Sequence, residues 1–123
     1  MATLTEGPHP GGFLIWEVLR DYTRETVTIA SGAGKLGPGT VLGKITSGDK
    51  YTVLTPGASN GSQNAAGILW GQADATDADA SAVVLVRGPA IVNRHEIVWP
   101  EGITEGQTNT AIAALTALGI LQR

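Results

Sequence analysis

The segment of this chain that comes closest to a catalytic pattern is residues 57–61 (GASNG), which match the G-x-S-x-G motif of serine hydrolases. Three aspartates and then His95 follow Ser59 in the order serine, acid, histidine that these hydrolases use. In the hydrolase fold, however, the serine lies on a sharp turn between a strand and a helix. Here it lies among turn-forming residues, and Asn60-Gly61 favours a tight turn over the start of a helix. We therefore interpret residues 55–64 as a loop and expect no nucleophile in it.

Two further patterns point weakly to ligand binding. Residues 32–36 (GAGKL) match the middle of a phosphate-binding loop, but the full motif needs glycine at position 29 and serine or threonine at position 36. The chain has Ile29 and Leu36 there. An acidic cluster lacks the turn glycine of a calcium-binding loop and its glutamate, because position 85 is leucine. We expect this cluster to be a solvated turn; it comprises Asp74, Asp77 and Asp79.

The remaining candidates for metal binding or catalysis are isolated. His9 and His95 have no partners at the spacing that metal ligands need. The absence of cysteine excludes disulfides, thiolate nucleophiles and zinc–thiolate sites together. The sequence therefore predicts a protein that is not an enzyme and has no catalytic residues, no cofactor and no metal.

Composition indicates a β-rich chain that buries surface against other chains. The 123 residues suffice for one domain, and seventeen glycines and six prolines divide them into short segments. Only 15% of residues are charged, against about 25% in an average soluble domain, while 42% are hydrophobic. The net charge is -3 and the eight Lys and Arg are scattered, which argues against nucleic-acid binding. We also expect no membrane span and no secretory signal.

The amino-terminal residues support two interpretations. Residues 1–12 are polar and rich in Pro and Gly, so we expect them to be disordered when the protein is free. The apolar stretch Phe13–Leu19 follows. It is either a first core strand or an adhesive arm that adds a strand to the sheet edge of a partner. Trp16 accordingly is either a core residue or an interface anchor, whereas Trp70 and Trp99 are expected to lie in the core.

Most of the rest of the chain has the pattern of short strands between turns. The alternation at residues 26–29 places Val27 and Ile29 on one face of a strand. Further strands are expected at residues 40–45, 51–54, 65–70, 82–87, 90–92 and 96–99. Pro100 ends the last of these, because proline cannot donate to a strand ladder.

The carboxy terminus changes to a helical period. Thr104 and Gln107 have the spacing of a capping box. Ala111, Leu115 and Leu118 share one face of the predicted short helix. Gly119 is placed for a left-handed C-cap, after which Ile120 is expected to pack back on Leu115. The predicted fold class is therefore mainly β with one short C-terminal helix.

Several segments, taken in order, resemble the phage lambda-type head decoration protein family. They are KLGPGTVLGKIT (35–46), AAGILW (65–70), AVVLVRGPAIV (82–92), IVWPEGIT (97–104) and AIAALTALGIL (111–121). The resemblance extends over most of the chain from about Phe13 onward. The order of the small-residue AAGIL strand, the WPE corner and the terminal helix is its most specific feature.

The resemblance implies a β-clip-like small domain over residues 20–123, preceded by a flexible N-terminal arm over residues 1–19. It further implies a homotrimer that binds the major capsid protein on the outer surface of the expanded head, after synthesis in the host cytoplasm. The arm would pair with capsid strands, and no nucleic acid, membrane or cofactor is implied. Its candidate capsid-binding residues are Phe13, Leu14, Ile15, Trp16 and Val18. The alternative is a small β-barrel domain of the tail or virion with a partner other than the capsid.

Overall fold

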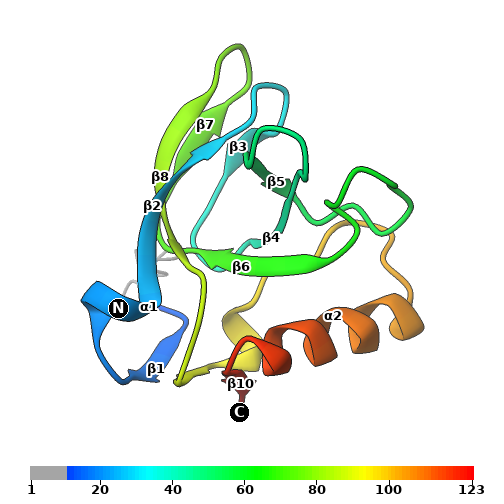
Figure 1. Ribbon diagram of the computed structural model, residues 1–123. Helices are drawn as coiled ribbons and strands as arrows, with labels where there is room; N and C mark the ends of the chain where they lie inside the picture. The colour runs from blue at the N-terminus through cyan, green and yellow to red at the C-terminus, as the bar shows by residue number, and fades with distance from the viewer. Residues whose placement is uncertain (1–10) are drawn as a thin grey trace, which may run out of the picture.

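The computed structural model describes residues 11–123, which fold into a barrel, a smaller sheet, a two-stranded ribbon and a C-terminal helix (Figure 1). The elements in chain order are β1 (Leu14–Glu17), α1 (Arg20–Thr23), β2 (Arg24–Ile29), β3 (Gly34–Leu36), β4 (Val41–Lys44), β5 (Tyr51–Val53), β6 (Ala65–Leu69), β7 (Ala73–Ala75), β8 (Ala80–Leu85), β9 (Ala90–Val92), the 3₁₀ turn η1 (Arg94–Glu96), α2 (Glu105–Ala117) and β10 (Ile120–Gln122). The predicted fold class, mainly β with one short C-terminal helix, is confirmed, since α1 is a single turn. The finer β-clip-like description stays a prediction.

The barrel is a closed ring of strands in the order β2-β5-β4-β6-β8. Its longest ladder is the antiparallel pair β2 and β8, which runs in register from Arg24↔Leu85 to Ile29↔Ala80. The predicted alternation in β2 is confirmed, because Ile29 is fully buried and Val27 packs against the same cluster. That cluster fills the barrel with Ile29, Leu42, Tyr51, Leu69, Ala73, Ala75, Ala82, Val84 and Val86.

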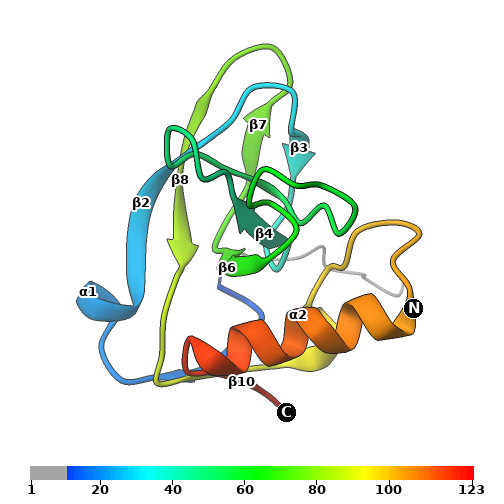
Figure 2. The ribbon, with the colours of Figure 1, turned by 45° about the vertical axis from the view of Figure 1, so that its right-hand side comes forward.

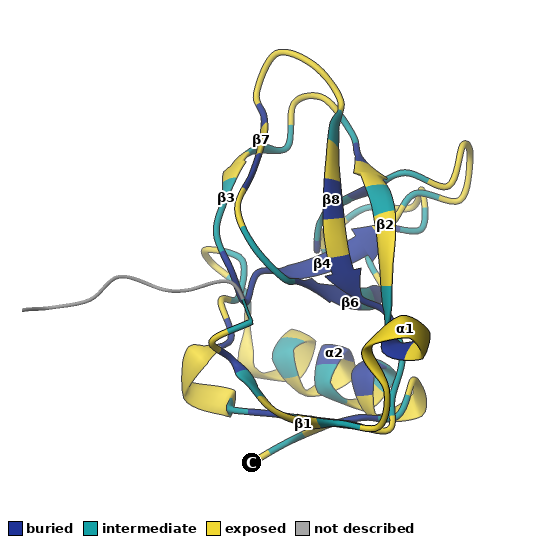
Figure 3. Ribbon diagram, turned by 90° about the vertical axis from the view of Figure 1, so that its left-hand side faces the viewer, coloured by how far each residue is buried: buried dark blue, intermediate teal, exposed yellow. Residues whose placement is uncertain are grey.

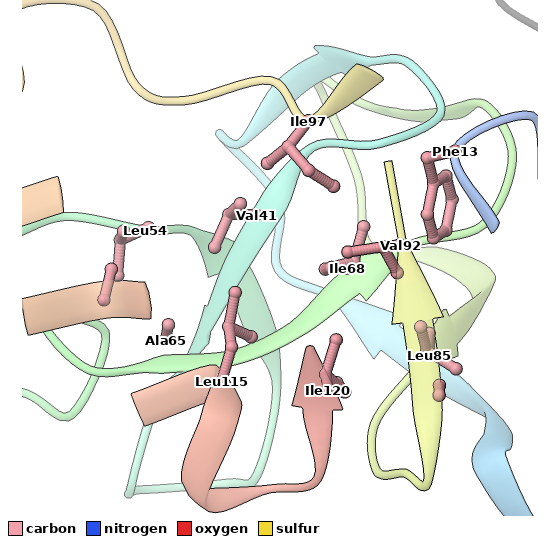
Figure 4. Close-up of a cluster of buried hydrophobic side chains, with 12 residues drawn as sticks. Phe13, Val41, Leu54, Ala65, Ile68, Leu85, Val92, Ile97, Leu115 and Ile120 are labelled. Atoms are coloured by element: carbon pink, nitrogen blue, oxygen red, sulfur yellow. The ribbon is translucent and has the colours of Figure 1, made fainter. Parts of the chain in front are cut away.

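A second layer closes one end of the barrel. It consists of α2 and a three-stranded sheet in the order β1-β9-β10. Figure 3 shows α2 between the barrel and β1, and the β3–β7 ribbon stands at the opposite end of the molecule from β10 (Figure 2). The main core lies between the layers, where the side chains of Figure 4 converge from the barrel strands, the sheet and the helix. It comprises Phe13, Val41, Leu54, Ala65, Ile68, Leu85, Ala90, Val92, Ile97, Ala111, Leu115 and Ile120.

Small residues let the barrel strands approach their neighbours closely. A Cβ atom at Gly67 in β6 would collide with the Val84 side chain and the Leu85 backbone. At Gly43 in β4 it would collide with the Ser62 backbone, which brings the loop of residues 55–64 against the barrel. The expectation that the AAGIL strand is buried and closely packed is confirmed, since four of its five residues are buried.

Two regions differ from the sequence prediction. The strand expected at residues 96–99 is wrong: residues 94–96 form η1, and Val98 makes an isolated bridge to Thr40. The cause is local, because the Asn93 side chain accepts a hydrogen bond from the His95 N–H and begins a tight turn. The ribbon of β3 and β7 and the last strand, β10, were not predicted, since each has only three residues and depends on a distant partner.

Helix α2 begins and ends where the sequence predicts. Thr104 and Gln107 form the complete capping box, and Gly119 has φ 90°, the left-handed conformation expected after the C-cap. Ala111, Leu115 and Ile120 are buried in the main core, whereas Leu118, the C-cap residue, is 36% exposed. Within residues 11–123, no helix is long and apolar enough to span a membrane.

Removing the hydroxyl of the N-cap should destabilise the fold measurably. Thr104→Ala leaves the Gln107 N–H without its acceptor, so we expect the free energy of unfolding to fall by about 1 kcal/mol in urea denaturation. Thr110→Ala is the matched control, because the Thr110 hydroxyl only donates to the Gly106 carbonyl within the helix. Equal losses for the two variants would contradict the capping role.

Candidate interaction surface

The five residues predicted to bind a partner lie together on and beside β1, but they face two directions. Phe13 is 2% exposed and belongs to the main core, and Leu14 packs against that core. Ile15, Trp16 and Val18 are half-exposed, at 56%, 50% and 50%. In the isolated chain, β1 pairs antiparallel with β9, so residues 13–17 are packed on the body of the protein. Residues 1–10 of the expected arm lie outside the described residues.

The outer edge of β1 is open in the part of the chain that the structure describes. The sheet order β1-β9-β10 makes β1 an edge strand, with β9 on one side only. An edge strand presents unpaired backbone N–H and C=O groups, which can accept a further strand. The register shifts between Leu14 and Trp16, so Ile15 lies at a bulge.

Exposed apolar side chains are concentrated next to this edge. Five of the nine large hydrophobic residues that are exposed in residues 11–123 fall within positions 15–22. We call them the β1–α1 patch: Ile15, Trp16, Val18, Leu19 and Tyr22. An exposed cluster of large apolar side chains in one place is typical of a protein interaction site.

The start of the described chain is held on the barrel by the Trp70 ring. The Gly11 N–H donates to the Trp70 carbonyl at 2.8 Å, and Gly11 lies so close to the indole that a Cβ atom there would collide with it. Phe13 meets the same ring edge-on, with centroids 5.7 Å apart. The Arg24 guanidinium lies 3.4 Å from the ring centroid. The contacts of Gly11 and Phe13 with this indole therefore fix where β1 begins, and Arg24 holds the first residue of β2 on the same ring.

A nearly buried ion pair fixes the other end of β1. The Glu17 carboxylate accepts hydrogen bonds from the Thr23 hydroxyl at 2.6 Å and from Arg24, through Nε at 3.2 Å and through Nη2. The Glu17 side chain is only 10% exposed and that of Arg24 22%. Burying a carboxylate is costly unless it is paired and hydrogen-bonded, as it is here. Sequence reasoning missed this role; the available signal was a single acid inside an apolar strand.

The family comparison decides what kind of protein carries this surface. The chain matches the family model described as Bacteriophage lambda head decoration protein D over residues 3–120. The chain belongs to this family. It is therefore a phage head decoration protein, a structural component that binds the capsid of the virion. A search of curated proteins found no match.

The chemistry-like patterns of the decoration protein fall on ordinary structural elements. Ser59 is exposed in an irregular loop that leads into β6, so the strand-to-helix turn of a hydrolase does not surround it. Lys35 lies in β3 and His95 in η1. Within residues 11–123, no three His, Cys, Asp or Glu side chains lie close enough together to hold a metal ion.

The acidic cluster serves turns and a connection between loops. Asp79 accepts from the Lys50 ammonium at 2.6 Å and from the Ser31 N–H at 2.8 Å; the first and then the second of these bonds hold the pKa of its carboxyl below the usual 3.8. The Thr76 hydroxyl and N–H likewise lower the pKa of Asp74, which is itself part of β7. Asp79 thus ties the loops after β2 and before β5 to the start of β8.

Disrupting the Glu17–Arg24 pair should cost more than disrupting an exposed pair of the same type. Arg24→Ala leaves the Glu17 carboxylate nearly buried with one donor, so we expect a loss of about 2 kcal/mol in the free energy of unfolding. Arg87→Ala is the control, because Arg87 also pairs with a glutamate and lies over an aromatic ring, but is exposed. We expect Arg87→Ala to lower the free energy of unfolding by less than about 1 kcal/mol. Equal losses in urea denaturation would contradict the role of the buried pair.

Acid should remove the contribution of Asp79. Because its pKa is lower in the folded protein than in the unfolded chain, its stabilising effect is full above pH 3.8 and is lost as the pH falls through the folded value. The melting temperatures of the wild type and Asp79→Asn should therefore differ at pH 7 and converge once the pH has fallen below the lowered folded pKa of Asp79. Asp77 carries the same charge, but its side chain makes no hydrogen bond within the described residues. Asp77→Asn should therefore change the melting temperature at pH 7 less than Asp79→Asn does. A difference for Asp79→Asn that persists in acid would refute this account.

Proposed function

We propose that the decoration protein binds the outer surface of the expanded phage head as a homotrimer and braces neighbouring major capsid subunits against the outward pressure of packaged DNA. The proposal rests on membership of the head decoration family. It involves no catalysis, nucleic acid or membrane. The protein would be made in the host cytoplasm and added to the virion from outside.

The observation that carries the proposal for this chain is the open edge of β1 beside the β1–α1 patch. An edge strand can pair with a capsid strand through its backbone, while exposed apolar side chains supply the buried contact area. Ile15, Trp16 and Val18 are half-exposed and would make such contacts directly. Phe13 and Leu14 would act from beneath, by holding the strand on the core.

Binding by three copies explains how a short contact can be strong. Each residue of the arm that becomes ordered loses about 1–2 kcal/mol of backbone entropy, so a single arm binds weakly. In a trimer the second and third contacts are intramolecular, and the overall affinity rises steeply. A trimer that holds several capsid subunits at once also opposes their separation.

Co-sedimentation with capsids tests the proposal. Purified protein is mixed with undecorated expanded heads and, separately, with unexpanded procapsids, and the pelleted protein is quantified. We expect saturable binding to expanded heads alone, near one trimer for each local threefold site, and a trimer mass by light scattering. If the protein bound neither particle, the proposal that it binds and braces the phage head would be refuted.

Two valines of nearly equal exposure test the role of the patch. Val18 is 50% exposed beside β1, and Val98 is 48% exposed outside the patch. We expect Val18→Ser to weaken binding to expanded heads about tenfold, because the loss at each site of a trimer adds to the others. Val98→Ser should bind as the wild type does. Equal binding by both variants would show that the patch is not the contact.

A further inference from the structure

The three-stranded sheet places one apolar row across its outward face. The register pairs Trp16 of β1 with Ile91 of β9, and Ile91 with Leu121 of β10. Side chains at paired positions lie on the same face of a sheet, and the residues before and after them lie on the other. We call Trp16, Ile91 and Leu121 the outer row. It joins three segments that are far apart in the sequence.

The burial of the neighbouring positions fixes which way the outer row faces. Ala90 and Ile120, which pair with each other, are 2% and 0% exposed, and Val92 is fully buried. These residues point into the main core, toward the barrel and α2. The outer row therefore points away from the body, and Trp16 and Leu121 are 50% and 37% exposed. Figure 3 shows β1 at the end of the molecule opposite the β3–β7 ribbon.

The ends of the three strands carry charges of both signs, with arginines in the majority. An exposed arginine follows each strand of the sheet within three residues: Arg20 after β1, Arg94 after β9 and Arg123 after β10. These are three of the eight Lys and Arg in a chain of net charge -3. Asp21 and Glu96 are the acids next to them in the sequence. An apolar centre with charges of both signs around it fits a partner surface that has apolar side chains surrounded by polar and charged groups.

We propose that the outer row is a second capsid contact, seated on the major capsid subunit beside the one that the arm binds. This inference rests on the proposed function. Its structural basis is that residues 1–10 join the described chain at Gly11, three residues before β1, which is both the open edge and one side of the outer row. Ten extended residues reach at most about 35 Å. Residues 1–10 therefore leave the described chain beside this face of the sheet, and a capsid subunit that this face contacts would be within their reach.

A substitution at Leu121 tests the outer row independently of the arm, because Leu121 lies on the last strand, β10. Leu121→Lys would place a charge within the proposed apolar contact, where it loses its water. The control is Val83→Lys, since Val83 is also a strand residue, is 38% exposed and lies on the barrel wall. We expect full-length Leu121→Lys to bind expanded heads at least about tenfold more weakly than the wild type, and Val83→Lys to bind normally. Both variants should keep the wild-type melting temperature within a few degrees, because both sites are exposed.

Each result has a distinct meaning. Weaker binding by Leu121→Lys alone, with an unchanged mass by light scattering, supports the second contact. If Leu121→Lys binds as the wild type does, while the wild type binds heads, the outer row is not a capsid contact and the proposed function stands. A change in the mass of free Leu121→Lys would show that copies of this chain cover the row, which also overturns the inference. If the wild type itself fails to bind, the proposed function fails as well.

Discussion

The packing around the Trp70 ring connects the N-terminal strand to the barrel. The ring receives Gly11, Phe13 and Arg24, and Arg24 in turn pairs with Glu17 at the far end of β1. One indole thus helps to position both ends of a strand whose one neighbouring strand, within the described residues, is β9. The position of the open edge, the direction of the exposed side chains and the point where residues 1–10 join the described chain all depend on these contacts.

A strand that is already ordered changes the energetics of binding. An arm that became ordered over its whole length would lose backbone entropy at every residue. In this structure β1 has lost that entropy on folding, so a partner strand that pairs with its edge meets a preorganised surface. The two interpretations of the apolar stretch are therefore compatible: Phe13, directly before β1, packs in the core, while the open edge and outward side chains of β1 remain exposed.

Local patterns in the sequence predicted the elements that local interactions determine. The alternation in β2, the small residues of β6 and both ends of α2 follow from neighbouring residues, and each was predicted correctly. The pairing of β3 with β7, of β10 with β9, and the outer row depend on partners distant in the chain, which periodicity cannot identify. Leu118 has the helical spacing of a buried residue but lies at the C-cap, where the helix no longer faces the core. The sequence thus predicted which segment carries the candidate surface, but not which of its side chains face outward or which distant residues lie beside them.

An open edge is also a hazard, because any exposed strand can pair with it. Three features of β1 limit this. The strand has four residues, its register is broken by a bulge at Ile15, and its last residue, Glu17, directs a charge inward. Proteins use short edges, bulges and inward-pointing charges to prevent unwanted pairing. A partner that bound at this edge would therefore have to match a short bulged strand and the apolar side chains beside it at the same time. This requirement favours a fixed surface of defined shape, such as an assembled shell, over a free unfolded segment.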